Sequence, residues 1–356
     1  MKKLDFSELA RKNIRTLQPY QANNIRCAVK LDANESPYPV TLANDVPGKI
    51  ASAALNRYPD PEAKRLKKAI ARKIGINTDA ILLGNGSDEL IYYLIIAFGG
   101  PVLYPVPTFS MYGIIAQALG ESHKGIPLDR DFDLDVDKIA AAIKRYRPKL
   151  IFLSSPNNPT GNCFSSDRIL KIIDMAKGIV VVDEAYQPFS SKKGFLPMIN
   201  DYTQLAILRT LSKIGLASLR VGYLVAADAL LKEVDKVRLP FNLNALSQLV
   251  AEAALRGSSL QDPVRAIISE RERLYEVMVK IPGVRPYPSE ANFIFFKVHD
   301  ADALHQRLLM HGVLVRNMNS AVRGALRVTI GAPEENDLFI EALKKTMGVK
   351  SCVPRQ

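Results

Sequence analysis

The middle of the chain alternates between short apolar runs and helical stretches, and no other feature limits the fold as strongly. Six apolar runs are typical of buried strands and lie at residues 81–83, 102–104, 150–153, 179–182, 205–208 and 221–226. Helical patterns precede or separate them, at 61–74, 88–98, 136–144 and 167–176. Because strand–helix–strand units place parallel strands side by side, we predict an α/β fold whose mostly parallel sheet has helices on both faces.

A second region with a different pattern follows residue 240. It contains a long charged helical pattern at 262–279, strand patterns at 292–298 and 326–330, and a closing helical pattern at 337–347. The first 40 residues are polar, and Pro37 and Pro39 favour an extended arm over a packed element. At roughly 150 residues per domain, 356 residues allow about two domains. We predict an arm at 1–40, a large domain at 41–240 and a smaller α+β domain at 241–356.

Composition and charge exclude several classes of protein. Hydrophobic residues make up 47% of the chain and charged residues 24%, which is ordinary for a globular protein. No apolar run is long enough to span a bilayer, and residues 1–13 mix charges without the apolar core of a signal peptide. We therefore expect a cytoplasmic protein without a membrane segment. The net charge of +12 allows nucleic acid, an anionic membrane surface or small anionic ligands as partners.

Cysteine and histidine usage gives no sign of a metal site. The three cysteines show no CxxC spacing and the four histidines show no HExxH pattern. His305 and His311 are six residues apart, which places them on different faces of a helix. We expect no bound metal and no disulfide framework.

Chemistry in a parallel sheet gathers at the carboxyl ends of the strands, and one such end carries an acid. The run 179–182 leads directly into Asp183-Glu184-Ala185-Tyr186. A carboxylate at the end of a buried strand is costly unless a cation pairs with it, so Asp183 is a candidate functional residue. A helix cap or a surface turn residue is the alternative for this motif.

A second strand end carries a lysine and an arginine. The run 205–208 leads into Thr210-Leu211-Ser212-Lys213, and Arg220 follows seven residues after the lysine. A lysine close behind a buried strand is a candidate for a nucleophilic amine. A solvated loop lysine is the alternative.

Two further strand ends carry loops with special backbone chemistry. The run 150–153 leads into SSPNNPTG, in which two prolines and a glycine form a rigid turn that aims an amide side chain. The run 81–83 leads into GNGS just before the helix expected from Asp88, and free N–H groups at such a helix start suit an anion. Tight loops and ordinary first-turn acids are the alternatives here, since neither a P-loop nor the dinucleotide fingerprint is present.

Taken in chain order, the four motifs resemble those of the fold type I pyridoxal-phosphate aminotransferases of class I/II. The resemblance rests on GNGSDE, SPNNPTG, VVVDEAY and RTLSK followed by LRVGY. It implies that Lys213 bonds the cofactor and then moves a proton on the substrate, and that Asp183 pairs with the pyridine nitrogen. Tyr186, which completes the implied catalytic set, and Asn158 match the pair that hydrogen-bonds the cofactor's 3′-oxygen.

The resemblance also implies the rest of a pyridoxal 5′-phosphate site and a homodimer with shared active sites. Phe109 matches the aromatic residue that stacks on the pyridine ring, and Tyr58 of the partner subunit would reach the phosphate. The arm would pack with the small domain and the partner subunit. Thr210 is also implied to bind the cofactor. The residues implied to surround the phosphate are Gly86, Ser87, Asp88, Ser212 and Arg220.

Within this family, the chain is similar to the histidinol-phosphate aminotransferases over nearly its whole length. The likeness is carried by LQPYQ at 17–21, LDANE at 31–35, RYPD at 57–60, LVRN at 314–317 and LRVTIG at 326–331. It implies transamination of L-histidinol phosphate with 2-oxoglutarate, giving imidazole-acetol phosphate and L-glutamate. Arg327 would bind the α-carboxylate, and Arg316 and Tyr20 the phosphate or imidazole end. Asn34 would also contact the substrate, while a strand-edge salt bridge is the alternative for Arg316.

Three other functions share parts of this pattern. An aromatic amino-acid aminotransferase and a decarboxylase of a phosphorylated amino acid would keep the cofactor residues and differ in the substrate contacts. A transcriptional regulator would need a DNA-binding segment, and the sequence before residue 31 shows no recognition-helix pattern, so we expect no nucleic-acid partner. Two departures from the family pattern are the seven-residue spacing from Lys213 to Arg220, where eight is common, and Phe109 in place of a tyrosine.

Overall fold

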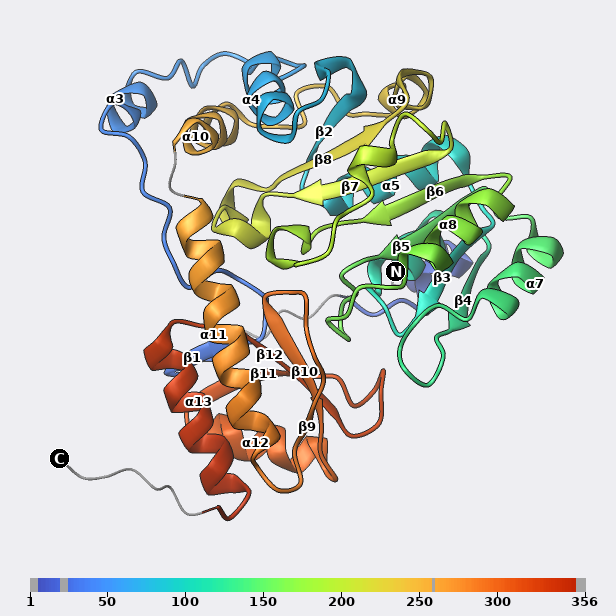
Figure 1. Ribbon diagram of the computed structural model, residues 1–356. Helices are drawn as coiled ribbons and strands as arrows, with labels where there is room; N and C mark the ends of the chain where they lie inside the picture. Colours follow the sequence, from blue (N-terminus) through green and yellow to red (C-terminus); the bar gives the residue numbers. More distant parts are fainter. Residues whose placement is uncertain (1–5, 20–24, 258–259, 350–356) are drawn as a thin grey trace, which may run out of the picture.

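The chain folds into two units joined by a long helix. The computed structural model describes residues 6–19, 25–257 and 260–349. In Figure 1, a seven-stranded sheet with its helices lies above a smaller five-stranded sheet, and α11 (Gln261–Val279) runs from the first unit along the second.

The larger sheet has the order β2-β8-β7-β6-β5-β3-β4. Its strands are β2 (Ile81–Asn85), β3 (Val102–Val106), β4 (His123–Pro127), β5 (Leu150–Ser154), β6 (Ile179–Asp183), β7 (Leu205–Thr210) and β8 (Val221–Ala226). The strands β3 to β7 pair in parallel, and β8 is antiparallel to both of its neighbours. The predicted mostly parallel sheet is therefore confirmed, with β8 as the one reversed strand.

Helices cover both faces of this sheet, as predicted. One face packs against α5 (Ser87–Phe98), α6 (Met111–Leu119) and α9 (Asp228–Asp235). The other packs against α4 (Lys64–Ile74), α7 (Val136–Tyr146), α8 (Ser166–Met175) and α10 (Ala245–Arg256). Because both faces are buried, the central strands are apolar at nearly every position instead of alternating.

The smaller unit is an α+β layer built from both ends of the chain. Its sheet has the order β1-β11-β12-β10-β9, with β1 parallel to β11. The strands are β1 (Val29–Leu31), β9 (Arg285–Pro286), β10 (Phe293–Lys297), β11 (Val313–Asn317) and β12 (Ala325–Thr329). Besides α11, the helices α12 (Ala301–Met310) and α13 (Pro333–Thr346) pack against it.

Short helical segments complete the described residues. The α-helical ones are α1 (Phe6–Leu9), α2 (Lys12–Arg15) and α3 (Val46–Ala51). The 3₁₀ segments are η1 (Thr78–Ala80), η2 (Gln187–Phe189), η3 (Leu196–Met198), η4 (Ser212–Ile214) and η5 (Ala217–Leu219). The segment with α2 is tied to α6, because the Asn13 amide donates to the backbone oxygens of Gln117 and Ala118 at 2.7 and 2.9 Å.

The six strands and the helices expected from the sequence are all present, but the arm was described wrongly in part. Residues 29–31 form a packed strand, with Val29 and Leu31 buried, where an extended arm without a packed element was expected. The strands β4, β9 and β11 and the helices α6, α9, α10 and α12 were not expected. The domain limits at 40 and 240 stay a prediction. The core of the larger unit includes Leu255 in α10 and Leu243 just before this helix.

Two features of the described residues bear on other functions. None of the helices in ranges 6–19, 25–257 and 260–349 is long and apolar enough to cross a membrane. The same ranges hold no group of three His, Cys, Asp or Glu side chains placed to bind a metal ion.

Candidate active site

Two adjoining cavities lie where the larger sheet meets the smaller unit. One has a volume of about 90 Å³ and sits over the carboxyl ends of β5, β6 and β7. The other has a volume of about 380 Å³ and is lined by residues of both units. Phe109, Asn158, Tyr186 and Lys213 line both, so these four side chains form the junction between a lower and an upper chamber.

A buried carboxylate forms the floor of the lower chamber. Asp183 is 4% exposed and ends β6, as its place after the apolar run predicts. Its Oδ1 accepts the Ala185 N–H at 3.0 Å and its Oδ2 accepts the Tyr112 hydroxyl at 2.6 Å. Burial raises the pKa of Asp183 from 3.8 to about 6, and no described cation pairs with it. The site therefore holds an acid that a cationic ligand atom would stabilise.

The predicted lysine lies across the same chamber. Lys213 belongs to η4, directly after β7, and its Nζ is 5.7 Å from the ring centroid of Tyr186. It forms no ion pair with a described residue, and it faces both chambers. An amine in this position is free to reach a ligand in the lower chamber and a substrate in the upper one.

The other end of the lower chamber is an anion cradle at the start of α5. Gly86 precedes the helix with a φ of 83°, and a Cβ there would collide with the Arg220 guanidinium. Arg220 pairs with Asp88 at 3.2 Å, and Ser87 lies beside them in the chamber wall. Helix N–H groups and a guanidinium that converge on one point suit an anion such as a phosphate group.

Hydroxyl groups complete this cradle. The Thr210 hydroxyl donates to the Ser212 hydroxyl at 2.9 Å, and both line the chamber. The seven-residue loop from Lys213 to Arg220 closes through two 3₁₀ turns, with Gly215 and Arg220 at positive φ. The shorter loop thus still delivers the Arg220 guanidinium to Gly86.

Two arginines face the upper chamber from neighbouring strands. Arg316 on β11 is directly opposite Arg327 on β12 in the antiparallel register, and both line the chamber. Like charges in this arrangement repel one another unless an anion lies between them. Arg327 is 7% exposed and donates to the Asn158 Oδ1 at 2.6 Å and to the Asp32 backbone oxygen at 2.7 Å.

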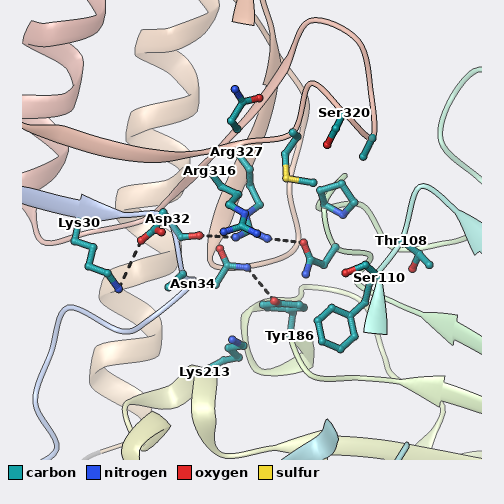
Figure 2. A pocket seen from close by; sticks show the side chains of 17 residues that line it. Lys30, Asp32, Asn34, Thr108, Ser110, Tyr186, Lys213, Arg316, Ser320 and Arg327 are labelled. Atoms are coloured by element: carbon teal, nitrogen blue, oxygen red, sulfur yellow. Dashed lines mark hydrogen bonds and ion pairs between the residues drawn. The ribbon is translucent and has the colours of Figure 1, made fainter. Parts of the chain in front are cut away.

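Figure 2 shows how the arm reaches this chamber. The Asn34 amide points to Tyr186 and donates to its hydroxyl at 2.9 Å. Asn34 itself is held by the Thr329 hydroxyl, which accepts its backbone N–H at 2.9 Å. Lys30 and Asp32 pair at 3.6 Å at the rim. The predicted residues Asn34, Tyr186 and Arg327 are therefore brought together from three distant parts of the chain.

The remaining predicted residues lie elsewhere. Phe109 is half-buried between the chambers, beside Asn158. Tyr58 is 81% exposed and stacks on Phe241, with 4.5 Å between ring centroids, so it faces away from this chain's own chambers. Tyr20 lies outside the described residues.

Three residues with polar contacts in the site were not expected from the sequence. Lys30 and Asp32 come from β1 and the residue after it, and Tyr112 comes from α6. Asp32 is two residues before Asn34 in LDANE, which is the one local signal for it. Tyr112 follows Phe109 by three residues, a helical spacing that would place both on one side of a helix start.

Comparison with known proteins identifies the family of this site. The pattern of the aminotransferase class I and II family matches residues 27–343. The histidinol-phosphate aminotransferase of Thermoanaerobacter pseudethanolicus is 42% identical over 350 residues, which cover 96% of this chain and 99% of that protein. The chain belongs to the class I and II aminotransferases, among the histidinol-phosphate aminotransferases.

Two further matches agree with this membership. The histidinol-phosphate aminotransferase of Aquifex aeolicus is 42% identical over 345 residues, or 94% of this chain and 97% of that protein. The crystal structure of histidinol-phosphate aminotransferase from Sinorhizobium meliloti in complex with pyridoxal-5′-phosphate superposes with a TM-score of 0.82. It is 27% identical and covers 91% of this chain and 92% of that one. The α/β aminotransferase fold predicted from the motifs is confirmed.

The residues of the lower chamber suit pyridoxal 5′-phosphate. Asp183 is a buried acid without a described cationic partner, which a protonated ring nitrogen would supply. The cradle of Gly86, Ser87 and Arg220 suits the phosphate, and Lys213 offers the amine. The anion cradle, the amine and the acid all line one chamber, as a ligand that carries a phosphate group, an aldehyde and a ring nitrogen requires.

Proposed function

We propose that this aminotransferase transfers the amino group of L-histidinol phosphate to 2-oxoglutarate in histidine biosynthesis. The observation that carries the proposal is the pair of chambers joined at Lys213. The lower chamber suits the cofactor, and the upper chamber has two opposed arginines whose charges suit an anionic group of a substrate. A substrate with an anionic group at one end and an amine at the other would bridge the two chambers.

Each residue of the lower chamber has a distinct task in this proposal. When bound, pyridoxal phosphate supplies an electron sink for the charge that develops on the substrate Cα. Asp183, as an anion, keeps the ring nitrogen protonated, and Lys213 moves the proton at the substrate Cα. Tyr186 and Asn158 orient the cofactor through its 3′-oxygen, and Phe109 offers a stacking face on the ring.

The phosphate of the cofactor has its own set of contacts in the proposal. Arg220 supplies the charge, and Ser87, Ser212 and Thr210 supply hydroxyls. The backbone N–H groups at Gly86, Ser87 and Asp88 add the helix start. These contacts would hold the cofactor in place while Lys213, at the other end of the chamber, acts on the substrate Cα.

The upper chamber must accept two different substrates in turn. L-Glutamate brings an α-carboxylate, for which Arg327 has the bidentate guanidinium geometry. L-Histidinol phosphate has no carboxylate, so its phosphate would lie between Arg316 and Arg327. Asn34, and Tyr20 outside the described residues, would contact the remaining part of the substrate. A pair of arginines accommodates both anions, since guanidinium forks suit carboxylate and phosphate alike.

The assembly and the location of the protein are part of the same proposal. We infer a cytoplasmic homodimer in which Tyr58 of the partner subunit reaches the cofactor phosphate. The exposed, ring-stacked Tyr58 supports this inference, because an outward tyrosine of this kind has a contact to gain from a second copy. The arm at 1–40 would pack with the small domain and the partner.

Transamination of purified protein with L-histidinol phosphate and 2-oxoglutarate tests the activity. We expect kcat/KM for histidinol phosphate to exceed that for phenylalanine or tyrosine by about tenfold or more, the worth of one anion contact. A higher value for the aromatic amino acids would overturn the substrate. Release of CO₂ from a phosphorylated amino acid would instead favour a decarboxylase.

The Lys213→Ala variant tests the active site. It should lose the absorbance of covalently bound cofactor and nearly all turnover, because no other described amine faces the lower chamber. Lys193→Ala, at an exposed loop position, is the matched control. Retained absorbance and activity in Lys213→Ala would contradict the assignment.

A further inference from the structure

A tyrosine that no motif points to contacts the key acid of the lower chamber. Tyr112, in the first turn of α6, is completely buried. Its hydroxyl donates to the Asp183 Oδ2 at 2.6 Å, the length typical of an O–H donor to a carboxylate anion. The Ala185 N–H donates to the other carboxylate oxygen, Asp183 Oδ1, at 3.0 Å. Tyr112 is therefore the side chain that holds the Asp183 carboxyl group.

The ring of Tyr112 is fixed independently of its hydroxyl. It stacks on Phe152 with ring centroids 4.8 Å apart and planes 8° apart, and it meets Phe109 edge to face at 5.6 Å. These contacts hold the phenol between strand β5 and the residue expected to stack on the cofactor. The ring contacts thus hold the hydroxyl toward Asp183 without help from a ligand.

Tyr112 keeps its hydroxyl proton and donates it to Asp183. Burial and the nearby Asp183 charge hold the pKa of Tyr112 far above its usual value of 10, so the phenol keeps its proton over the working range. A permanent donor stabilises the anionic form of its acceptor, whereas burial of Asp183 stabilises the neutral form.

We propose that Tyr112 is a positioning residue that lowers the proton affinity of Asp183, so that the proton between this acid and the cofactor stays on the ring nitrogen. The proposal rests on the proposed function, since it gives Asp183 its role. Without the phenol, the carboxylate would be the stronger base and would take the proton itself. The ring would then be neutral and a weaker electron sink.

Other charged groups face Asp183 and set the background against which Tyr112 acts. Asp88 from α5 and Glu184 next in the chain both favour the protonated acid. The remaining groups around the chamber are Tyr186, Lys213 and Arg220. None of these groups donates to Asp183. Among the described residues, the Tyr112 hydroxyl is therefore the one side-chain donor to Asp183 that a substitution can remove.

Titration of the cofactor-free protein tests the proposal directly. In ¹³C spectra of aspartate side chains, with Asp183→Asn used for assignment, Asp183 should titrate near pH 6 in the wild type. In Tyr112→Phe the midpoint should move up by about one pH unit or more, because a hydrogen bond to a charged group is worth about tenfold or more in this equilibrium. The pH below which pyridoxal phosphate binds weakly should rise by the same amount.

Tyr104→Phe is the matched control. Tyr104 is also a tyrosine of this cluster, with its ring centroid 6.3 Å from that of Tyr112, but its hydroxyl pairs with His123 at 2.9 Å. It should leave the Asp183 midpoint unchanged. An unchanged midpoint in Tyr112→Phe, with wild-type protein that binds the cofactor, would overturn the role of Tyr112 alone. Wild-type protein that failed to bind pyridoxal phosphate would instead overturn the proposed function.

Discussion

Single residues of this site carry charges that a ligand of opposite charge would stabilise. Asp183 is buried without a described cation, and Arg316 and Arg327 are opposed across two strands. Each arrangement costs free energy in the cofactor-free protein, and each matches one group of a bound molecule. The unfavourable placement of these charged groups therefore indicates a ligand-binding site even in the ligand-free structure.

The raised pKa of Asp183 predicts how stability depends on pH. Folding raises this pKa from 3.8 to about 6, so the folded cofactor-free protein binds the proton more tightly than the unfolded chain. The contribution is fully present below about pH 4 and is lost as the pH rises through about 6, with a size of about 3 kcal/mol. Asp183→Asn lacks this dependence.

Unfolding in urea at pH 4.5 and pH 7 measures the effect. Asp129 and Glu270 have lowered pKa values and act in the opposite direction, but they do so in both proteins. The variant should therefore gain stability relative to the wild type as the pH rises. A difference between the two proteins that stays constant across this range would refute the linkage.

The residues at strand ends could be predicted because their signal is local. An apolar run followed at once by Asp183, or closely by Lys213, marks a strand end in the sequence itself. The contact between Tyr112 and Asp183 joins residues 71 positions apart, and that between Asn34 and Tyr186 joins residues 152 apart. Such pairs depend on how the sheet is assembled, which no local pattern encodes.

At the scale of elements, the anion cradle of Gly86, Ser87 and Arg220 exists because β8 passes very close to the start of α5. Gly222 on β8 is opposite Gly84 on β2, and a Cβ at Gly222 would lie 2.5 Å from the backbone of Gly86 and Ser87. Backbone atoms at that distance must shift. The glycine thus lets the strand that follows Arg220 lie against the helix start.

Substitution at this crossing should separate cofactor binding from folding. Gly222→Ala should push the start of α5 away, weaken pyridoxal phosphate binding about tenfold or more and cost about 1–3 kcal/mol of stability. Gly48→Ala in α3, where nothing lies within 4 Å of the added Cβ, is the control and should not weaken binding. Fluorescence titration with the cofactor measures the change, and unaltered affinity in Gly222→Ala would show that the cradle does not depend on this contact.

The pairing of Arg316 with Arg327 shows why contacts between neighbouring strands could not be predicted from the sequence. Residues 325–329 were close to an expected strand, but β11 at 313–317 was not expected. The two arginines are 11 positions apart in the chain and become neighbours only through the β11–β12 hairpin. The family resemblance supplied their roles, whereas their direct opposition came from the structure.

At the scale of the whole molecule, the upper chamber lies between the two units, and residues of both units line it. β1 near the amino terminus pairs with β11 near the carboxyl terminus, and this sheet faces the strand ends of the larger one (Figure 1). Arg271 on α11 ties the units together, since it donates to the backbone oxygens of Phe189 and Ala291, each at 3.0 Å. The chamber is therefore sensitive to any change in the packing of the two units.

A shared active site makes a prediction that only the assembled molecule can test. If Tyr58 of the partner subunit completes each site, every site takes its lysine from one subunit and its Tyr58 from the other. Tyr58→Ala and Lys213→Ala then remove residues that different subunits supply to the same site. A hybrid dimer then has one site with both defects and one site with neither. At a cofactor concentration where Tyr58→Ala by itself turns over slowly, mixing it with the inactive Lys213→Ala under conditions that exchange subunits should raise the turnover to about a quarter of the wild-type value, since about half of the dimers are hybrids.

The control for this experiment is a mixture that has no intact site in any dimer. Lys213→Ala mixed with the double variant Tyr58→Ala, Lys213→Ala should stay inactive, because every site lacks its lysine. Recovery in the first mixture alone would place Tyr58 and Lys213 of one site on different subunits. Absence of recovery, with exchange confirmed by mass-labelled subunits, would mean that each chain completes its own site, and the exposed stack of Tyr58 on Phe241 would then serve only the folded monomer.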